Sequence, residues 1–358
     1  MTAREIAEKF ELSGEIKDVR PYGDGHINDT FLVKTTIKKF VMQRINTFVF
    51  TDVEVLMDNI VKVTSYLNDQ IDKQSGDVRQ KIRIIPTTEG KYYYACAEGA
   101  FRMYTYAEHT RSVNIPLSNE HFKKGAVCFA TFVKYLLDYP ADTLVDVIPD
   151  FHNTRSRYKA FESAVKDDEF GRLCEVRDLV KFVQDRQKYV GLLVDKLENG
   201  LLPYRVTHND TKFNNLLLDD ETFNPVAVID FDTIMKGTIC YDFGDAIRAG
   251  CNSAEEDEAD LNKVYFDFDK YEAFAKGYIR TLGQYITAEE KDNLAFSCIL
   301  ITLECGIRFL TDYLRGDCYF KTHYPKQNVY RAKTQFKLVY DMEQRLEDMK
   351  QVIADATC

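Results

Sequence analysis

The sequence has no tryptophan, only eight prolines and 17 glycines in 358 residues, and no repeat or low-complexity stretch. So little Gly and Pro argues against a disordered or fibrous chain. The nine cysteines are scattered, without C-x-x-C pairs or Cys/His metal spacing, which speaks against a disulfide scaffold and against a zinc site. We therefore expect a well-packed globular body whose thiols are reduced.

Basic residues are fewer than acidic residues in this chain. Lys and Arg number 47 against 57 Asp and Glu, which gives a formal net charge of −10, and no basic run stands out. This balance disfavours nucleic acid or an anionic membrane as a partner. The N-terminus lacks a signal-peptide pattern, and no apolar run approaches the ~18 residues that span a bilayer. We expect a cytoplasmic protein, and its oligomeric state is left open.

The length exceeds the size at which one hydrophobic core usually stops growing, so two substructures that share a cleft are expected. Residues 22–45 alternate like two short strands, and residues 81–107 have the β-branched and aromatic content of strands. Between them, Thr51 and Glu54 have capping-box spacing before a run of apolar residues at helical intervals. Residues 1–107 are therefore predicted to form a small sheet with one helix.

The remainder of the chain has mainly helical periodicity. Apolar residues mark one helix through residues 122–137 and another through residues 176–193. A further long helix begins at the capping box of Thr287 and Glu290. The sequence thus predicts an α+β fold with a small β-rich lobe followed by a larger, mainly helical lobe over residues 108–358.

Short strand-like pieces inside the second lobe carry the residues with the clearest chemistry. His208, Asp210 and Asn215 follow the spacing H-x-D-x-x-x-x-N, and a hydrophobic strand then leads to Asp230 and Asp232. Phosphoryl transfer needs a carboxylate to receive the proton of the attacking hydroxyl, and oxygen ligands that hold Mg²⁺ across the nucleotide phosphates. In this layout Asp210 is the base, Asn215 and Asp230 are metal ligands, and His208 holds the loop. Asp232 is a further metal-ligand candidate. The alternative is an Asp/Asn-rich turn whose side chains only satisfy the backbone.

On these motifs the chain resembles the aminoglycoside phosphotransferase and choline kinase family over nearly its whole length. The resemblance implies a two-lobed protein-kinase-like fold that uses ATP and Mg²⁺, with a nucleotide-binding lobe at residues 1–107. It also implies that the Asp-Phe-Gly at residues 242–244 is not the metal motif, since Asp230 has that role. Asp242 is interpreted as structural, for example as a helix N-terminal cap.

Two features of the first lobe bear on nucleotide binding. Gly23 and Gly25 lie where the family has a phosphate-covering loop, in which Gly permits close backbone approach; a plain hairpin turn is the alternative. The next strand departs from the family pattern, because Gln43 stands where Lys or Arg usually contacts the phosphates, and alternation sends Arg44 to the opposite face. Glu54, the natural partner of such a base, is then equally a capping residue.

Residues 104–109 connect the two predicted lobes. Kinases of this resemblance hold adenine there by main-chain hydrogen bonds, which makes Tyr106 and Glu108 the candidate nucleotide contacts. A plain interdomain linker is the alternative, and both can be true.

A closer resemblance is to the N-acetylhexosamine 1-kinases, which use ATP to make sugar 1-phosphates from N-acetylglucosamine and N-acetylgalactosamine. It is carried by five blocks, at residues 23–28, 207–212, 229–235, 304–310 and 316–320. The implied function is phosphorylation of the anomeric hydroxyl of an N-acetylhexosamine.

A sugar site needs fixed polar groups for the hydroxyls and apolar surface for the ring faces. His26, Arg308 and Tyr319 are the candidates that would act beside Asp210. Arg308 has the alternative of a helix ion pair with a carboxylate one turn away, at residue 304 or 312. His26 has the alternative of a solvent-facing turn residue, and Tyr319 that of simple packing.

Two rival functions stay in view. A kinase for another small alcohol, such as choline, homoserine or an aminoglycoside, is one, although the absence of Trp disfavours the aromatic cage that choline kinases use. A weakly active nucleotide-binding protein is the other, and it follows from the unusual Gln43. The preferred epimer and nucleotide are left open.

Overall fold

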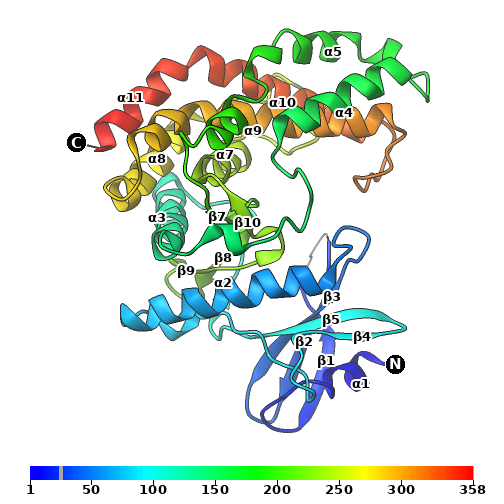
Figure 1. The fold of residues 1–358 in the computed structure, drawn as a ribbon, viewed down its shortest axis with the longest axis vertical. Helices are drawn as coiled ribbons and strands as arrows, with labels where there is room; N and C mark the ends of the chain where they lie inside the picture. Colours follow the sequence, from blue (N-terminus) through cyan, green and yellow to red (C-terminus); the bar gives the residue numbers. More distant parts are fainter. Residues whose placement is uncertain (24–26, 358) are drawn as a thin grey trace.

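The smaller lobe is built on one antiparallel sheet with the strand order β1-β2-β3-β5-β4 (Figure 1). The structure of the protein, a computed structural model, describes residues 1–23 and 27–357. The elements of this lobe are α1 (Ala3–Ala7), β1 (Ile16–Pro21), β2 (Asp29–Thr35), β3 (Lys39–Ile45), α2 (Val53–Lys73), η1 (Val78–Gln80), β4 (Tyr94–Cys96) and β5 (Gly99–Thr105).

Alternation along β3 and β5 divides the side chains of the sheet between two faces. One face packs with α1 around a small core that includes Phe40, Met42 and Met103. The opposite face presents Gln43 and Arg102, which are direct partners in the register of the two strands. This second face is the one that turns towards the larger lobe.

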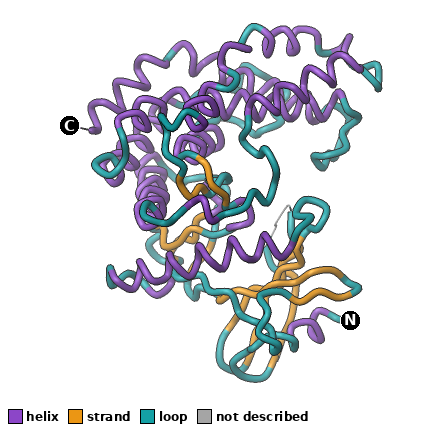
Figure 2. The backbone as a smooth tube through the Cα atoms, viewed as in Figure 1, coloured by secondary structure: helices purple, strands orange, loops and turns teal. Residues whose placement is uncertain are grey.

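Helix α2 lies between the sheet and the larger lobe, as Figure 2 shows. Its apolar stripe joins the main core of the protein, and Asn59 donates from Nδ2 to the carbonyl oxygens of Val145 and Ile234 in the second lobe, at 2.7 and 3.0 Å. The predicted capping box is wrong, because Asp52 caps the helix by accepting from the N–H of Val55. Glu54 is exposed.

The second lobe is mainly helical around two small sheets, β10-β7 and β6-β8-β9. The structure thus confirms the α+β, two-lobed fold, and the division predicted at residue 107 lies in the connection between β5 and β6. Its elements are β6 (Thr110–Arg111), α3 (Asn119–Leu136), η2 (Ala141–Thr143), α4 (Thr154–Asp167), η3 (Leu173–Glu175), α5 (Arg177–Gln184), η4 (Gln187–Tyr189), α6 (Leu192–Glu198), β7 (Arg205–Thr207), η5 (Phe213–Asn215), β8 (Leu216–Asp219), β9 (Pro225–Val228), η6 (Phe231–Thr233), β10 (Met235–Gly237), α7 (Ile239–Gly250), α8 (Phe268–Leu282), α9 (Ala288–Leu314), α10 (Gln327–Gln344) and α11 (Leu346–Thr357).

One predicted helix differs from the observed structure, and another begins where it was expected. The single helix expected over residues 176–193 is split into α5 and α6, because Gly191 adopts a left-handed conformation (φ +85°) that restarts the chain at α6. The long helix α9 does begin at the capping box of Thr287 and Glu290. Part of α9 is apolar enough over 18 residues to cross a membrane, which the sequence analysis passed over. Because 78% of that stretch is buried inside the protein, α9 is a core helix.

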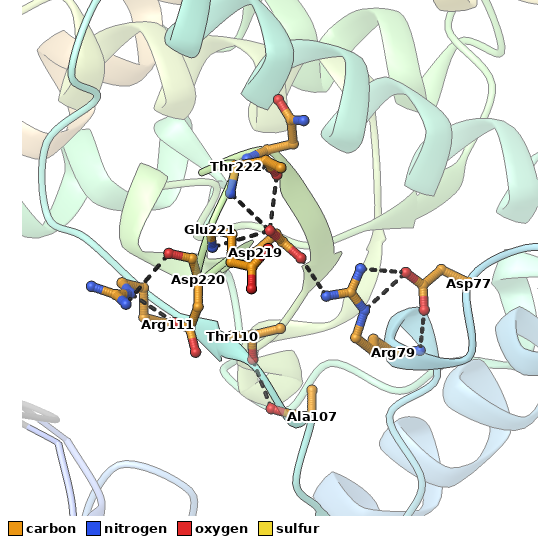
Figure 3. A network of polar contacts seen from close by, with 10 residues as sticks. Asp77, Arg79, Ala107, Thr110, Arg111, Asp219, Asp220, Glu221 and Thr222 are labelled. Carbon is orange, nitrogen blue, oxygen red and sulfur yellow. Dashed lines mark hydrogen bonds and ion pairs between the residues drawn. The ribbon is translucent and has the colours of Figure 1, made fainter.

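A polar network joins the two lobes beside their connection (Figure 3). Arg79 of η1 donates to Asp77 and, at 2.5 Å, to Oδ2 of Asp219, at the end of β8. Oδ1 of Asp219 accepts from the backbone N–H groups of the turn that follows. The hydrogen bond from Arg79 and those from Thr222 hold the pKa of Asp219 well below its usual range. This network therefore links the end of α2 to the β8-β9 turn of the second lobe.

Replacing Arg79 should loosen this connection. We expect Arg79→Ala to lower the Tm by a few degrees, because Asp219 loses its only cation among the described residues. Arg111→Ala is the matched control: Arg111 pairs with Asp220 in the same turn, but half of its side chain is exposed, and such pairs contribute little. Differential scanning fluorimetry makes the comparison, and equal Tm values for the two variants would contradict the role given to Arg79.

Candidate active site

The predicted catalytic loop runs from the end of β7 to η5 and is almost wholly buried at its start. Asn209 adopts a left-handed backbone conformation (φ +63°), which Asn tolerates better than most residues. Its side chain donates to the carbonyl oxygen of Thr233 at 2.8 Å, beside β10. The turn after β7 is therefore shaped by a residue that the motif leaves unspecified.

His208 positions the loop. Its Nε2 lies 2.9 Å from the carbonyl oxygen of Ile229, and its Nδ1 accepts from the backbone N–H of Asp210 at 3.3 Å. These partners assign the neutral tautomer with the proton on Nε2. The ring is fully buried and packs against Phe132 and Phe231, so it joins the loop to the strand before Asp230 instead of facing a substrate.

Asp210 is held by two neighbours in its own loop. Asn215 donates from Nδ2 to both the carbonyl oxygen of Asp210 and its Oδ2, at 2.7 and 3.1 Å. Lys212 contacts Oδ1 at 2.9 Å. Burial would raise the pKa of Asp210, but the charge and hydrogen bond of Lys212 outweigh it, so the pKa lies below its ordinary value. Asp210 is therefore ionised at neutral pH, as a base must be. Sequence reasoning missed Lys212, although its place two residues after Asp210 was a readable signal.

Helix α7 braces the loop from behind with two carboxylates. Asp242 accepts from the backbone N–H groups of His208 and Asn209, at 2.9 and 2.7 Å. Asp245 accepts from the N–H of Thr211 at 2.9 Å. The suggestion that Asp242 caps the helix is wrong, since Thr238 is the N-cap and Asp242 lies within the first turns. Burial raises the pKa of Asp242. Sequence reasoning missed Asp245.

Asp230 and Asn215 supply oxygen atoms of the kind Mg²⁺ prefers. Asp230 has a left-handed conformation (φ +66°), and the residue is exposed. Enclosure by protein together with the charges of Asp232 and Asp210 raises its pKa to about 6. We give most weight to the two charges, because the side chain itself is accessible. Asn215 commits its nitrogen to Asp210, which leaves Oδ1 for a cation. In residues 1–23 and 27–357 no group of three or more His, Cys, Asp or Glu side chains is arranged to hold a metal ion by itself. These residues fit a metal held partly by nucleotide phosphates.

Asp232 is nearly inaccessible, and both of its oxygens are engaged. Oδ1 forms an ion pair with Arg102 of β5, and Oδ2 accepts from Nδ2 of Asn28 at 2.6 Å. Asn28 in turn accepts from the backbone N–H of Asn46 at 2.9 Å. A metal role for Asp232 stays a prediction, and it would require Asp232 to share or exchange these contacts.

The predicted nucleotide contacts lie along the sheet side of the cleft. Gly23 has the positive φ (+73°) expected of a tight turn, whereas Gly25 and His26 lie outside the described residues. Gln43 lies on the face of β3 that turns towards the larger lobe, is partly exposed, and accepts two hydrogen bonds from Arg102. Their roles towards a nucleotide stay predictions.

The connection after β5 carries the two candidates for adenine binding. Tyr106 packs edge-on against Tyr22, with ring centroids 6.1 Å apart, and Lys39 lies over its ring. Lys39 also pairs with the carboxylate of Glu108 at 2.7 Å. These side-chain contacts fix the segment and are compatible with main-chain contacts to adenine.

Arg308 lies half-buried on α9 with its guanidinium between two aromatic rings. Its Cζ is 5.0 Å from the ring centre of Phe151 and 5.5 Å from that of Phe320. Cation–π contact with two faces holds the side chain while leaving its N–H donors free for another partner.

The alternative expected for Arg308, an ion pair with a carboxylate of its own helix, is not observed. Glu304 instead contacts Nδ1 of His152 at 3.1 Å. Asp312 accepts from the backbone N–H groups of residues 318–320, at 2.8 to 3.0 Å. Among the described residues no carboxylate lies within ion-pair distance of Arg308.

Tyr319 stands on the loop that Asp312 holds. Its side chain is half exposed and packs edge-on against Phe320, with centroids 4.9 Å apart. It is therefore close to the aromatic surface around Arg308 and is not part of the core.

A chain of contacts connects Arg308 to the catalytic loop. Cys305, one turn earlier on α9, lies near Arg248. Arg248 donates from Nε to Asp245 at 2.9 Å, and Asp245 accepts from the N–H of Thr211. The C-terminal half of α9 therefore lies directly behind the loop that carries the predicted base.

A β-rich lobe, a helical lobe and a His-Asp-Asn loop between them define a kinase-like phosphotransferase. The chain belongs to the phosphotransferase enzyme family, whose model matches residues 18–275.

Solved structures share this fold at low sequence identity. A microcompartment-associated aminopropanol kinase is 16% identical, with a TM-score of 0.59, and covers 97% of this chain and 98% of its own. A choline kinase from Cryptosporidium parvum Iowa II is 14% identical, with a TM-score of 0.56, over 92% and 90% of the two chains. A spectinomycin phosphotransferase solved with ADP and spectinomycin is 13% identical, with a TM-score of 0.53, over 92% and 94%.

The raised pKa of Asp230 predicts a pH-dependent loss of stability. Below its ordinary pKa the carboxyl is protonated in both the folded and the unfolded chain. As the pH rises through about 6, the folded protein must ionise Asp230 beside two other carboxylates, so stability is lost. Asp230→Asn removes this charge and should raise the Tm at pH 7.5 by up to roughly 2 °C.

The comparison at two pH values separates charge from backbone strain. Asn also suits a left-handed conformation better than Asp, but that gain does not depend on pH. Thermal unfolding without added metal at pH 4.5 and 7.5 should therefore show a larger advantage for Asp230→Asn at pH 7.5. An increase in Tm that is equal at both pH values would show that the charge of Asp230 does not destabilise the fold.

Proposed function

We propose that this protein transfers the γ-phosphoryl group of ATP to the anomeric hydroxyl of an N-acetylhexosamine. Membership of the phosphotransferase family and a His-Asp-Asn loop with an ionised Asp210 support transfer to a hydroxyl. The sugar is supported by the resemblance to N-acetylhexosamine 1-kinases and by the surroundings of Arg308.

Asp210 is the group that takes the proton from the attacking hydroxyl. Its low pKa makes it a weak base in the ground state, but it is ionised, fixed by Asn215, and needs only to receive a proton as the O–P bond forms. Lys212 contacts Oδ1 of Asp210 at 2.9 Å and helps to hold the base in position. Asn215 and Asp230 would hold Mg²⁺, which supplies charge neutralisation for the phosphates when bound.

The observation that carries the acceptor class is the guanidinium of Arg308 between Phe151 and Phe320. Two aromatic faces offer apolar surface to a pyranose ring, and free N–H donors offer hydrogen bonds to its hydroxyls or to an acetamido carbonyl. A fixed cation without a carboxylate partner opposes a cationic acceptor, because like charges repel in a partly desolvated site. Choline, amino alcohols and aminoglycosides are cations at neutral pH.

One observation favours the rival, an amino-alcohol kinase. Oε2 of the buried Glu304 has no hydrogen-bond partner among the described residues, and a carboxylate is what an ammonium group would seek. Its other oxygen contacts His152, so the free charge is partly offset if that ring is protonated. We favour the sugar because Arg308 is less enclosed than Glu304.

Asp210→Asn should reduce turnover by at least ~100-fold while leaving the fold and ATP affinity nearly unchanged, because positioned proton transfer contributes 10²–10⁴. Asn keeps the hydrogen-bonding shape beside Asn215 and Lys212 but cannot take the proton. Asp220→Asn in the β8-β9 turn is the matched control and should keep wild-type turnover. Coupled ADP-release assays with ATP titrations measure both, and near-normal turnover would remove Asp210 as the base.

The position of the new phosphate tests the sugar assignment. N-Acetylglucosamine or N-acetylgalactosamine should give an acid-labile 1-phosphate, visible by phosphorus NMR. A methyl glycoside should be inert, because its anomeric oxygen has no proton to give Asp210. A 6-phosphate product, turnover of the methyl glycoside, or activity only with choline or amino alcohols would exclude a 1-kinase.

Arg308 should matter for the acceptor and not for the nucleotide. We expect Arg308→Ala to raise the KM for the sugar by roughly 10-fold or more, with a smaller fall in kcat, since a lost positioning contact also misplaces the nucleophile. Arg315→Ala, at the exposed end of the same helix, is the control. Unchanged sugar KM in Arg308→Ala would take Arg308 out of the site.

A further inference from the structure

Gln43 departs from the family pattern, and the neighbouring strand supplies the cation that is missing at this position. Gln43 on β3 and Arg102 on β5 are direct partners in the antiparallel register, so their side chains stand side by side on one face of the sheet. That face turns towards the predicted metal segment. A cation is thus present next to the place where the family has it, on a different strand.

Gln43 holds this arginine in place. Nε and Nη2 of Arg102 both donate to Oε1 of Gln43, at 3.1 and 2.8 Å. Nε2 of Gln43 donates to the hydroxyl of Thr30 on β2 at 3.2 Å, which sets the orientation of the amide with its oxygen towards the guanidinium. The ring of Tyr104 lies 5.1 Å from the Cζ of Arg102. Glutamine at this position therefore fixes the position of the Arg102 guanidinium by hydrogen bonds.

The carboxylate that pairs with Arg102 also differs from the one that the family pattern suggests. Arg102 is completely buried, which is costly for a guanidinium unless it is paired, and its ion pair is with Asp232. Glu54 on α2, the expected partner, is exposed and takes no part. Both members of the pair come from elements other than those the family pattern suggests.

We propose that Arg102 is the cation that contacts the phosphates of the nucleotide, held for that task by Gln43 and Asp232. The inference rests on the proposed ATP-dependent phosphoryl transfer. A purely structural role would be to neutralise the buried Asp232. Two points favour the phosphate role: Arg102 pairs with Asp232, only two residues from the candidate metal ligand Asp230, and a planar guanidinium is suited to bidentate contact with phosphate.

The proposal implies an exchange of partners. Nε and Nη2 of Arg102 each donate one hydrogen bond to Gln43, and Nη1 lies in ion-pair contact with Asp232, so other N–H donors of the five have no hydrogen-bond partner among the described residues. A phosphate that approaches along the cleft would take up these donors and compete with Asp232 for the guanidinium. Asp232 would then have an oxygen free to act as the further metal ligand that the sequence predicted.

Equilibrium binding without metal tests the contact separately from catalysis. In EDTA, calorimetric titration should show that the wild-type protein binds ADP more tightly than adenosine. Arg102→Gln should weaken ADP binding by roughly 10- to 100-fold, the usual effect of losing a charged hydrogen bond, and change adenosine binding less than twofold. Adding Gln43→Lys to this variant should restore much of the ADP affinity.

A second variant covers the case in which Arg102→Gln does not fold. Gln43→Glu has nearly the same shape, can accept the same bonds from Arg102, and neutralises the guanidinium, so ADP affinity should again fall relative to adenosine. Arg44→Gln is the matched control, since Arg44 points to the other face and pairs with Asp29 at the surface. It should leave both affinities unchanged.

The outcomes distinguish this inference from the proposed function. An ADP-to-adenosine affinity ratio that stays at the wild-type value in Arg102→Gln or, if that variant is unfolded, in Gln43→Glu overturns the inference alone. A wild-type protein that binds ADP no better than adenosine in EDTA overturns it too. A wild-type protein that binds no nucleotide even with Mg²⁺ overturns the proposed function itself.

Discussion

The crowding of three carboxylates in one small volume is the constraint on which the rest of the site depends. The charges of Asp210 and Asp232 both oppose the ionisation of Asp230. Lys212 compensates Asp210 and Arg102 compensates Asp232. Within the described residues Asp230 has no cation in ion-pair contact, and enclosure by protein together with the charges of Asp232 and Asp210 raises its pKa to about 6. Two of the charges are therefore balanced by fixed side chains, and that of Asp230 is not.

Such a loop needs a rigid support, and α7 provides it. Asp242 and Asp245 accept backbone N–H groups of the catalytic loop, so the helix holds the backbone and not the reacting side chain. Between them, Phe243 is buried in the core, and Gly244 lets α7 approach α9, where a Cβ would lie 2.7 Å from the carbonyl oxygen of Ser297. The Asp-Phe-Gly segment is therefore a structural joint between the loop and the core helix.

The sequence allowed the prediction of contacts between residues that are close together along the chain. The His-Asp-Asn spacing could be interpreted because Asn215 bonds to Asp210 only five residues away, within a single turn of chain. Arg102 could not be found in this way, since its ion-pair partner Asp232 lies 130 residues further along, and its pairing with Gln43 depends on a strand register that neither segment reveals. The same limit hid Asp245. The start of α2 was predicted one residue too early, because the adjacent Thr51 and Asp52 can each act as an N-cap.

The interpretation of Gln43 as the mark of a weakened site assumed that the phosphate-contacting cation must come from β3. Electrostatic stabilisation depends on where a charge stands and how firmly it is held, and not on the strand that supplies it. In an antiparallel sheet, directly paired residues on one face stand about 5 Å apart, a distance that a long side chain spans easily. Because Arg102 occupies that neighbouring position and Gln43 fixes it there, the missing basic residue on β3 is no argument against catalysis.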